Sequence, residues 1–136
     1  MKNNLAALIS KLNRYQKKYL NHHLKDTDLE ASQAIILLKI KENSEITPKE
    51  IFEMGIVEKP SVSKILKKLE DMNFIEKNSS NKDGRSYSVS LTEDGLKMCS
   101  FIDSIINELN IVYEKIASKF LSEDLMKILN EVYNEK

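Results

Sequence analysis

The two prolines of the chain mark the starts of two short helices, and this punctuation restricts the possible folds. Thr47-Pro48-Lys49-Glu50 joins a Thr-x-x-Glu capping box to a proline in the first helical turn, where a missing N–H group costs nothing. Gly55 ends this helix after a few residues, and a second helix is expected from Pro60 to Met72. Two short helices joined by a glycine-containing turn predict a helix-turn-helix.

The residues after Met72 change from a helical period to a period of two. Phe74-Ile75 begins a strand, and the segment from Asn78 to Gly84 reads as a turn with Asp-Gly at its tip. Residues 86–91 then alternate between serine and an apolar side chain, which predicts a half-buried strand with one polar face. A β-hairpin directly after a helix-turn-helix is a wing. Asn73, before the hairpin, is expected to take the left-handed conformation that ends a helix.

Two amphipathic helices precede this region. The first carries one narrow apolar stripe and is capped by Asn3 or Asn4. The stripe consists of Leu5, Leu8, Leu12, Tyr15, Tyr19 and His22. Thr27 and Glu30 have the spacing of a capping box and predict the start of a second, largely buried helix.

Two more helices follow the hairpin. Thr92 is expected to cap a long helix over 96–119, and Ser122 to cap a last one. The narrow stripe of the first helix and a double stripe on the fifth leave surplus apolar surface, which an obligate homodimer would bury. The predicted fold is mainly α with a small β-hairpin wing. It is one domain over 1–136, with a winged helix-turn-helix lobe at 28–95 flanked by dimerisation helices at 1–25 and 96–136.

Composition favours a cytoplasmic protein. Apolar residues make up 41% of the chain, no apolar stretch reaches the ~20 residues that span a bilayer, and one cysteine excludes an intrachain disulfide. The net charge is zero, but residues 59–87 carry seven bases against four acids, or +3, so the remaining chain carries −3. A basic middle between acidic flanks is compatible with DNA binding.

The helix from Pro60 to Met72 carries the candidate DNA-reading residues. Its apolar residues share one side, and the other side is polar and basic. With Lys59 just before it, the predicted contact set is Lys59, Pro60, Ser61, Ser63, Lys64, Lys67 and Lys68. A helix fits the major groove of B-DNA, where lysine can donate to guanine and serine to several base edges. Lys67 and Lys68, farther along, are better placed for phosphates.

The tip of the hairpin carries a second set of candidate contacts. Lys82 and Arg85 flank the tip, where a projecting cation gains from the negative potential of the minor groove. Asp83 is expected to hold Arg85 in position by a charge-assisted hydrogen bond. The segment from Thr47 to Leu91 is therefore the predicted DNA-binding part.

The wing carries a family resemblance. Asp83-Gly84-Arg85, followed by the segment from Val89 to Gly95, resembles the D-x-R…LTxxG signature of the MarR family of bacterial regulators. Leu29-x-x-x-Gln33-x-x-x-Leu37 resembles that family's second helix, residues 60–70 its recognition helix, and Phe74-Ile75-Glu76-Lys77 the strand that follows. The resemblance implies a homodimer with interlocking terminal helices that binds a pseudo-palindromic operator. It also implies repression relieved by a small effector held between the dimer helices and the DNA-binding lobe.

The chain departs from that family's pattern at three positions. Asn73 stands where the family usually has glycine, and Lys77 replaces a common arginine. Pro60 takes a position in the recognition helix that usually holds a small polar residue, which predicts a different sequence preference.

The residues that might sense a signal have simpler interpretations. Cys99 invites a redox role, but a buried structural thiol is preferred. His22 and His23 suggest a metal, but adjacent helical residues diverge by ~100°, so no metal site and no cofactor are expected. The effector stays unidentified, although aromatic residues could line its cavity. These are Tyr15, Tyr19, Phe101 and Tyr113.

Other function classes fit the sequence less well. A winged domain that docks another protein is the main alternative, and the basic wing counts against it. A metal- or redox-sensing regulator of the same fold is the other. An enzyme is not expected, because the three glycines fall at separate turns and no nucleophile–base pairing emerges.

Overall fold

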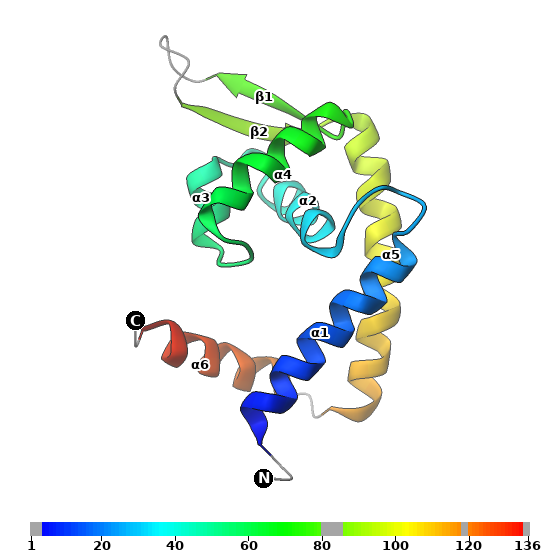
Figure 1. The fold of residues 1–136 in the computed structure, drawn as a ribbon, viewed down its shortest axis with the longest axis vertical. Helices are drawn as coiled ribbons and strands as arrows, with labels where there is room; N and C mark the ends of the chain where they lie inside the picture. The colour runs from blue at the N-terminus through cyan, green and yellow to red at the C-terminus, as the bar shows by residue number, and fades with distance from the viewer. Residues whose placement is uncertain (1–3, 80–85, 118–119, 135–136) are drawn as a thin grey trace. The chain divides into compact units, whose positions relative to one another are not determined.

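The computed structural model describes residues 4–79, 86–117 and 120–134 of the chain. They form α1 (Leu5–His23), α2 (Ala31–Asn43), α3 (Pro48–Glu53), α4 (Lys59–Asp71), β1 (Ile75–Ser79), β2 (Tyr87–Leu91), α5 (Glu93–Ile116) and α6 (Leu121–Asn134), as Figure 1 shows. This mainly helical fold with one hairpin confirms the predicted fold class. Two compact units divide within α5, one over 1–105 and the other over 106–136. Within the described ranges, no helix is both long enough and apolar enough to cross a membrane.

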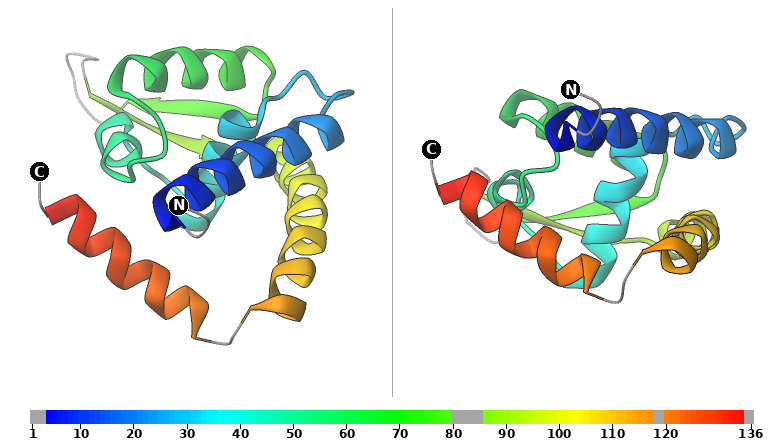
Figure 2. Two further views of the ribbon diagram at one scale, coloured as in Figure 1. Left: turned by 60° about the horizontal axis from the view of Figure 1, so that its bottom comes forward. Right: turned by 90° about the horizontal axis from the view of Figure 1, so that it is seen from below.

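Helix α2 lies at the centre of the first unit. Its apolar residues surround the helix, and Ala34, Ile36, Leu37 and Ile40 are all buried. The helix packs against α1, α4 and β2 (Figure 2). A helix that is apolar all round is stable only when other elements cover it, so α2 acts as the support on which the DNA-binding candidates rest.

The start of α2 differs from the sequence prediction. The Thr27–Glu30 capping box is wrong: the Thr27 hydroxyl donates to the Leu24 carbonyl (2.6 Å) and accepts from the Leu29 N–H group (3.1 Å). Asp28 has a positive φ of 64°, so the chain turns between the two predicted partners. The Glu30 N–H group donates instead to the Gln33 side chain (3.0 Å). The Ala31 N–H group donates to the Asn21 side chain from α1 (2.7 Å), a partner that sequence spacing does not reveal.

The helix-turn-helix forms as predicted. Thr47 caps α3, accepting from the Glu50 N–H group (3.2 Å), while the Glu50 carboxylate accepts from the Thr47 N–H group (3.1 Å). These hydrogen bonds hold the pKa of Glu50 below its usual value, the backbone donor contributing most. Gly55 has a φ of +72° in the turn, and Asn73 has a φ of +63° after α4. Asparagine therefore takes the left-handed position that the helix end requires.

The hairpin pairs antiparallel, from Ile75 opposite Leu91 to Ser79 opposite Tyr87. Ile46 forms an isolated β-bridge to the second strand, because its backbone exchanges hydrogen bonds with Val89 (3.1 and 2.8 Å). Val89 is fully buried, as the alternating pattern predicts. The hairpin is thus joined through its second strand to the segment before α3.

The predicted polar face of β2 is partly wrong. Ser88 is buried, and its hydroxyl forms a short hydrogen bond to the Glu45 carboxylate. Ser90 accepts a hydrogen bond from the Asn78 side chain across the hairpin (3.0 Å). Ser88 therefore has an internal partner in the segment between α2 and α3, Ser90 is half-buried with a partner across the hairpin, and Ser86 is exposed.

The junction between the wing and α5 depends on Thr92. Its hydroxyl accepts from the Gly95 N–H group (3.0 Å), which confirms the predicted cap, and donates to the Asn73 carbonyl (2.6 Å). A Cβ atom at Gly95 would collide with the carbonyl oxygen of Phe74. Only glycine therefore lets the start of α5 lie this close to the start of the wing.

The second unit holds the C-terminal part of α5 and helix α6. A hollow of about 560 Å³ lies between them. It is lined by Asn110, Tyr113, Glu114, Ala117, Leu121, Ser122 and Leu125. Burial raises the pKa of Tyr113. Helix α6 begins at Leu121, so Ser122 lies inside its first turn, and the prediction that Ser122 caps the helix is wrong.

Candidate nucleic-acid interface

Helix α4 separates its residues into a buried side and an exposed side. Val62, Ile65, Leu66 and Leu69 are buried in the first unit, so the rotation of the helix about its own axis is fixed. Pro60 lies in the first turn, where its fixed φ suits the start of a helix. Packing of the apolar side therefore determines which polar residues face outward.

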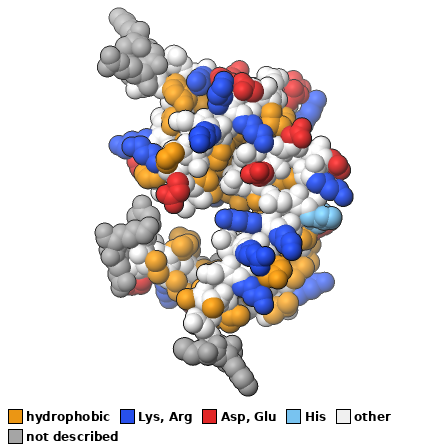
Figure 3. All heavy atoms as spheres, in the orientation of Figure 1, with side chains coloured by type: hydrophobic (Ala, Val, Ile, Leu, Met, Phe, Trp, Pro, Cys, Tyr) orange, Lys and Arg blue, Asp and Glu red, His pale blue; other side chains and the backbone are white. Residues whose placement is uncertain are grey.

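The exposed side of α4 carries most of the predicted contact residues. Lys59, Pro60, Ser63, Lys64 and Lys67 are exposed, and Ser61 and Lys68 are half-buried. Figure 3 shows several lysine or arginine side chains over this part of the molecule. Within the described part of the chain, Lys59 and Lys64 have no hydrogen-bond or ion-pair partner, so both ammonium groups are available to an external anion.

The two lysines at the C-terminal end of α4 already have partners. Lys67 lies 3.7 Å from the Asp71 carboxylate in an exposed ion pair, which water and salt weaken. Lys68 donates to the Asp28 carbonyl (2.6 Å) and to the Gln33 side chain (3.0 Å). Lys68 thereby ties α4 to the start of α2, a role that the sequence does not suggest. Among the predicted lysines that the structure describes, it is the least available.

A shallow depression of about 460 Å³ lies where α3 meets the start of α4. It is lined by Pro48, Lys49, Phe52, Glu53, Lys59, Val62 and Ser63. Phe52 is 41% exposed and supplies an apolar floor beside two predicted contact residues. Lys49 and Phe52 are additions to the candidate surface. The sequence indicates only that both lie in a short helix just before α4, and the packing of α3 on α4 places them beside Lys59 and Ser63.

The stem of the wing presents a cation over an aromatic ring. The Lys77 ammonium lies 4.6 Å from the centroid of the Tyr87 ring, a cation–π contact across the hairpin. Sequence analysis did not include this pair; in the observed register Lys77 lies opposite Val89, and Tyr87 is its diagonal neighbour on the other strand. The predicted tip residues Lys82, Asp83 and Arg85 lie outside the described residues.

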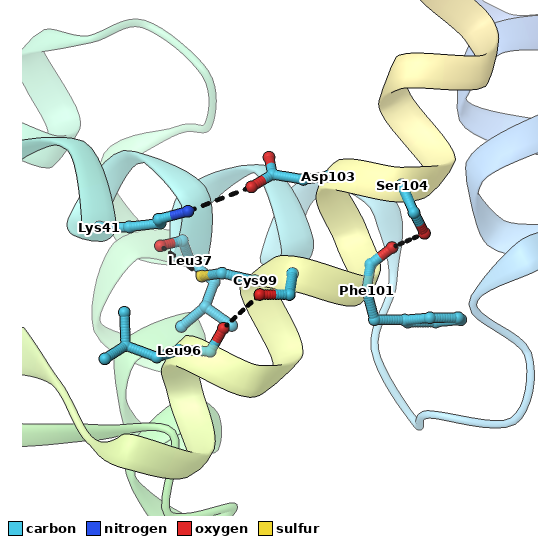
Figure 4. Close-up of polar contacts among 8 residues, drawn as sticks. Leu37, Lys41, Leu96, Cys99, Phe101, Asp103 and Ser104 are labelled. Carbon is cyan, nitrogen blue, oxygen red and sulfur yellow. Dashed lines mark hydrogen bonds and ion pairs between the residues drawn. The ribbon is translucent and has the colours of Figure 1, made fainter.

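Cys99 is buried against α2. Its side chain is fully covered, and its thiol lies 3.7 Å from the Leu37 carbonyl oxygen (Figure 4). Burial raises the pKa of the Cys99 thiol to about 11, although Lys41, paired with Asp103 at 3.2 Å, acts in the opposite direction. A buried, protonated thiol is a poor nucleophile, which agrees with the structural interpretation and not with a redox sensor.

The paired histidines have a local role at the end of α1. The His23 ring lies 4.4 Å from the Tyr19 ring, tilted by 51°, and meets the His22 ring edge-on at 5.3 Å. Both lie in the last turn of α1, near the negative end of the helix dipole. Among the described residues, no three His, Cys, Asp or Glu side chains lie close enough together to hold a metal ion.

Comparison with known proteins gives consistent matches. The family model described as the transcriptional regulator SarA/Rot matches residues 18–105. The regulator SarZ of Staphylococcus epidermidis is 28% identical over 123 residues, which cover 88% of this chain and 81% of SarZ. A MarR protein from Peptoclostridium difficile has a TM-score of 0.87 at 23% identity, with 99% of this chain and 91% of that chain covered.

One solved relative contains DNA. A mutant MarR from E. coli, complexed with operator DNA, has a TM-score of 0.75 and 25% identity, and the match covers 94% of this chain and 92% of that one. Together the matches confirm the predicted resemblance to MarR-type winged-helix regulators. The relatives are named as transcriptional regulators, in agreement with the prediction that the chain is not an enzyme.

Proposed function

The chain belongs to the SarA/Rot family of transcriptional regulators, and we propose that it binds double-stranded DNA with sequence preference through α4 and the wing. The exposed side of α4 carries this proposal. Lys59, Ser63 and Lys64 project from the first half of a helix whose opposite side is anchored in the core. An α-helix fits the major groove, and residues near its N-terminus reach deepest.

The residues of α4 divide into two roles. Ser61, Ser63 and Lys64 read base edges, because they lie in the first half of the helix and carry hydrogen-bond donors. Lys59 and Lys67 bind phosphates and position the helix without reading sequence. Lys68 contributes to DNA binding indirectly, by holding α4 against α2.

The wing binds the neighbouring minor groove. Lys82 and Arg85 supply cations at its tip, and Asp83 orients Arg85. Lys77, placed over the Tyr87 ring, adds a phosphate contact at the stem. The DNA-bound E. coli MarR, a relative of the same fold, supports duplex DNA as the partner.

We infer that the active species is a homodimer. Helices α1, α5 and α6 each expose large apolar side chains, among them Leu5 at 70% and Ile116 at 85%. Isolated apolar side chains are normal on a surface, but a run of them on each of three helices requires a cover. A second copy supplies that cover and imposes two-fold symmetry, so the operator is a pseudo-palindrome.

The regulator is proposed to act as a repressor in the cytoplasm, and a small effector relieves repression. Such an effector binds more tightly to a dimer in which the distance between the two α4 helices does not match the distance between the operator half-sites. It therefore shifts the population toward a form that binds the operator poorly. The hollow beside Tyr113 in the second unit has a volume within the usual range for small-molecule sites, which supports the presence of an effector.

Selection of bound sequences from a random duplex pool tests the proposed function. Purified protein at moderate salt should enrich an inverted repeat whose half-sites lie about one helical turn apart. Binding without enrichment would indicate a sequence-independent role. Absence of binding even at low salt, where phosphate contacts are strongest, would refute DNA as the partner of the protein alone.

A further inference from the structure

The first 25 residues carry positive charge only. They contain six lysines or arginines and neither aspartate nor glutamate. The expectation of an acidic flank on the N-terminal side is therefore wrong for these first 25 residues. The acids that balance the charge of the chain lie after Lys25, in residues 26–58 and 88–136. Surface helices usually mix both signs, so a one-sided helix requires an explanation.

Arg14 and Lys17 of α1 lie opposite its apolar stripe, and Lys11 and Lys18 border one edge of the stripe beside Tyr15. At ~100° per residue, Arg14 is about 180° from Leu5 around the helix. Lys11, Arg14, Lys17 and Lys18 are all exposed, as are Leu5, Leu8 and Leu12 on the other side. If a second copy covers the apolar stripe, Arg14 and Lys17 therefore still face solvent in the dimer, with Lys11 and Lys18 at the edge of the covered surface.

Three of these cations gather around Tyr15. The Lys11 ammonium, the Arg14 guanidinium carbon and the Lys18 ammonium lie 5.9, 5.5 and 5.7 Å from the centroid of its ring. Within the described ranges, none of the three, nor Lys17, has a carboxylate partner. The ring of Tyr15 offsets part of their mutual repulsion through cation–π attraction.

The basic side of α1 and the exposed side of α4 are visible together. Figure 3 shows lysine and arginine side chains over both helices on one face, and both helices belong to the first unit. A regularly charged polyanion engages several such cations at once, and each contact releases a counterion. Lysine and arginine are also donors only, which suits phosphate oxygens.

We propose that the basic side of α1, formed by Lys11, Arg14, Lys17 and Lys18, is a second, sequence-independent contact surface for the phosphate backbone of duplex DNA. This surface binds DNA that flanks the site read by α4, so the inference rests on the proposed function. An anionic membrane is a less suitable partner, because a helix that lies on a bilayer inserts its apolar side. In α1 that side is the one that the dimer covers.

Two triple variants with the same change of charge provide the test. Lys11→Gln/Arg14→Gln/Lys18→Gln removes the cations around Tyr15. The matched control, Lys97→Gln/Lys115→Gln/Lys127→Gln, removes three exposed cations from α5 and α6. Affinity is measured as a function of salt on a duplex of roughly 20 base pairs, which holds only two half-sites, and on a longer duplex with flanking DNA.

The wild-type protein should bind the longer duplex more tightly, and the α1 variant should lose that gain. On the longer duplex, the slope of log K against log salt should fall by up to about 2.7 for each subunit that contacts flanking DNA, or about 5.4 for a dimer, at 0.9 for each lost phosphate contact. Preference for the selected sequence over random DNA should stay unchanged in the α1 variant. The control variant should match the wild type in both slope and length dependence. Lys11→Arg/Lys18→Arg, which keeps the charge, should also match the wild type.

Three results would overturn the proposal. The first is an α1 variant that keeps the wild-type slope on the longer duplex, although circular dichroism and sedimentation show it to be folded and of native mass. The second is a control variant that loses as much slope as the α1 variant, which would reveal an effect of total charge. The third is that vesicles of anionic phospholipid bind the wild-type protein but not the α1 variant, while the longer duplex binds both equally. The sequence preference of α4 variants tests the proposed function, whereas the slope and length dependence of the α1 variant test this proposal. The two can therefore fail independently.

Discussion

Lys68 of α4 donates a hydrogen bond to the side chain of Gln33 at 3.0 Å, and Gln33 in turn accepts from the Glu30 N–H group at the start of α2. The same lysine donates to the Asp28 carbonyl at 2.6 Å. One side chain therefore links α4 to α2, the central helix of the first unit. This link sets Lys68 apart from Lys64, which lies one turn earlier and is exposed.

The two lysines should respond differently to substitution. Lys68→Ala removes charge-assisted hydrogen bonds at a half-buried position, so the free energy of unfolding should fall by about 1–2 kcal/mol. Lys64→Ala changes an exposed side chain, so stability should stay within about 0.5 kcal/mol. Its effect should instead appear in DNA binding, as weaker affinity and a changed sequence preference. Urea denaturation and DNA titration of both variants measure this contrast. Equal effects on stability would contradict it.

The cap of α3 predicts both a loss of stability and a pH dependence. Thr47→Ala removes the hydroxyl that accepts from the Glu50 N–H group, and loss of such a cap costs about 1 kcal/mol. The pKa of Glu50 should rise, because the hydroxyl also donates to its carboxylate at 2.9 Å. Thr47→Ser keeps the hydroxyl and is the control.

The sign of the pH effect follows from the lowered pKa. A carboxyl group whose pKa is lower in the folded state stabilises the fold above its ordinary pKa, and this contribution disappears as the pH falls through the lowered value. The stability difference between wild type and Thr47→Ala should therefore be largest near neutral pH and shrink in acid. Denaturation at several pH values checks this, and a difference that grows on acidification would disprove it.

Substitution of Gly95, at the junction between the wing and α5, should reduce stability more than substitution of Gly55, in the turn after α3. Gly95→Ala places a Cβ atom against the Phe74 carbonyl and 3.2 Å from the Leu91 side chain, so the backbone must shift. We expect a loss of about 1–3 kcal/mol, as for other overpacked sites. Gly55→Ala has open space and only the strain of a positive φ, which costs about 1 kcal/mol. Thermal unfolding ranks the two variants, and the reverse order would contradict the packing argument.

Local signals were sufficient to predict most of the fold. The caps at Thr47 and Thr92 and the left-handed residue Asn73 depend on residues three or fewer positions away, so the sequence contains both partners. The period of two also identifies β2, and the apolar side of α4 identifies its buried face.

The errors at Thr27 and Ser122 are misplaced helix starts, whereas others arise where a partner comes from elsewhere in the chain. Ala31 finds its acceptor in Asn21 of the preceding helix, and Ser88 is covered by Glu45. A helical wheel likewise places Lys67 and Lys68 together, but only the packing of α4 on α2 separates an exposed ion pair from an internal tie. Sequence therefore predicts which side of α4 is polar, but not which of its cations remain available.

Cys99 predicts an alkaline limit to stability. Burial raises the pKa of this thiol from 9.0 to about 11, so the folded state holds the proton more tightly than the unfolded state. The stabilising contribution is complete below the unfolded pKa and disappears as the pH rises toward the folded pKa, by at most about 3 kcal/mol. The wild-type protein should therefore lose stability between pH 9 and 11 more steeply than Cys99→Ala. Parallel pH profiles for the two proteins would contradict the burial argument.

The same burial predicts that DNA binding is insensitive to oxidants. Peroxide reacts with thiolates, and a thiol of this pKa is almost entirely protonated at neutral pH. Treatment that oxidises an exposed cysteine should leave DNA affinity unchanged, and thiol labelling should be slow until urea unfolds the protein. Rapid labelling of the native protein, together with loss of DNA binding, would restore the redox-sensing alternative.

The wing supplies the prediction that bears most directly on the mode of DNA binding. Arg85→Ala should weaken binding by about tenfold at both the selected operator and unrelated DNA, because the minor-groove potential attracts a cation with little regard to sequence. Sedimentation should show an intact dimer, since the wing lies outside the terminal helices. Ser61→Ala and Lys64→Ala provide the contrast, because changes on the reading side of α4 should alter which sequences are preferred. If Arg85→Ala binds both DNAs as tightly as the wild type, the wing is not a DNA contact and α4 must hold the duplex without it.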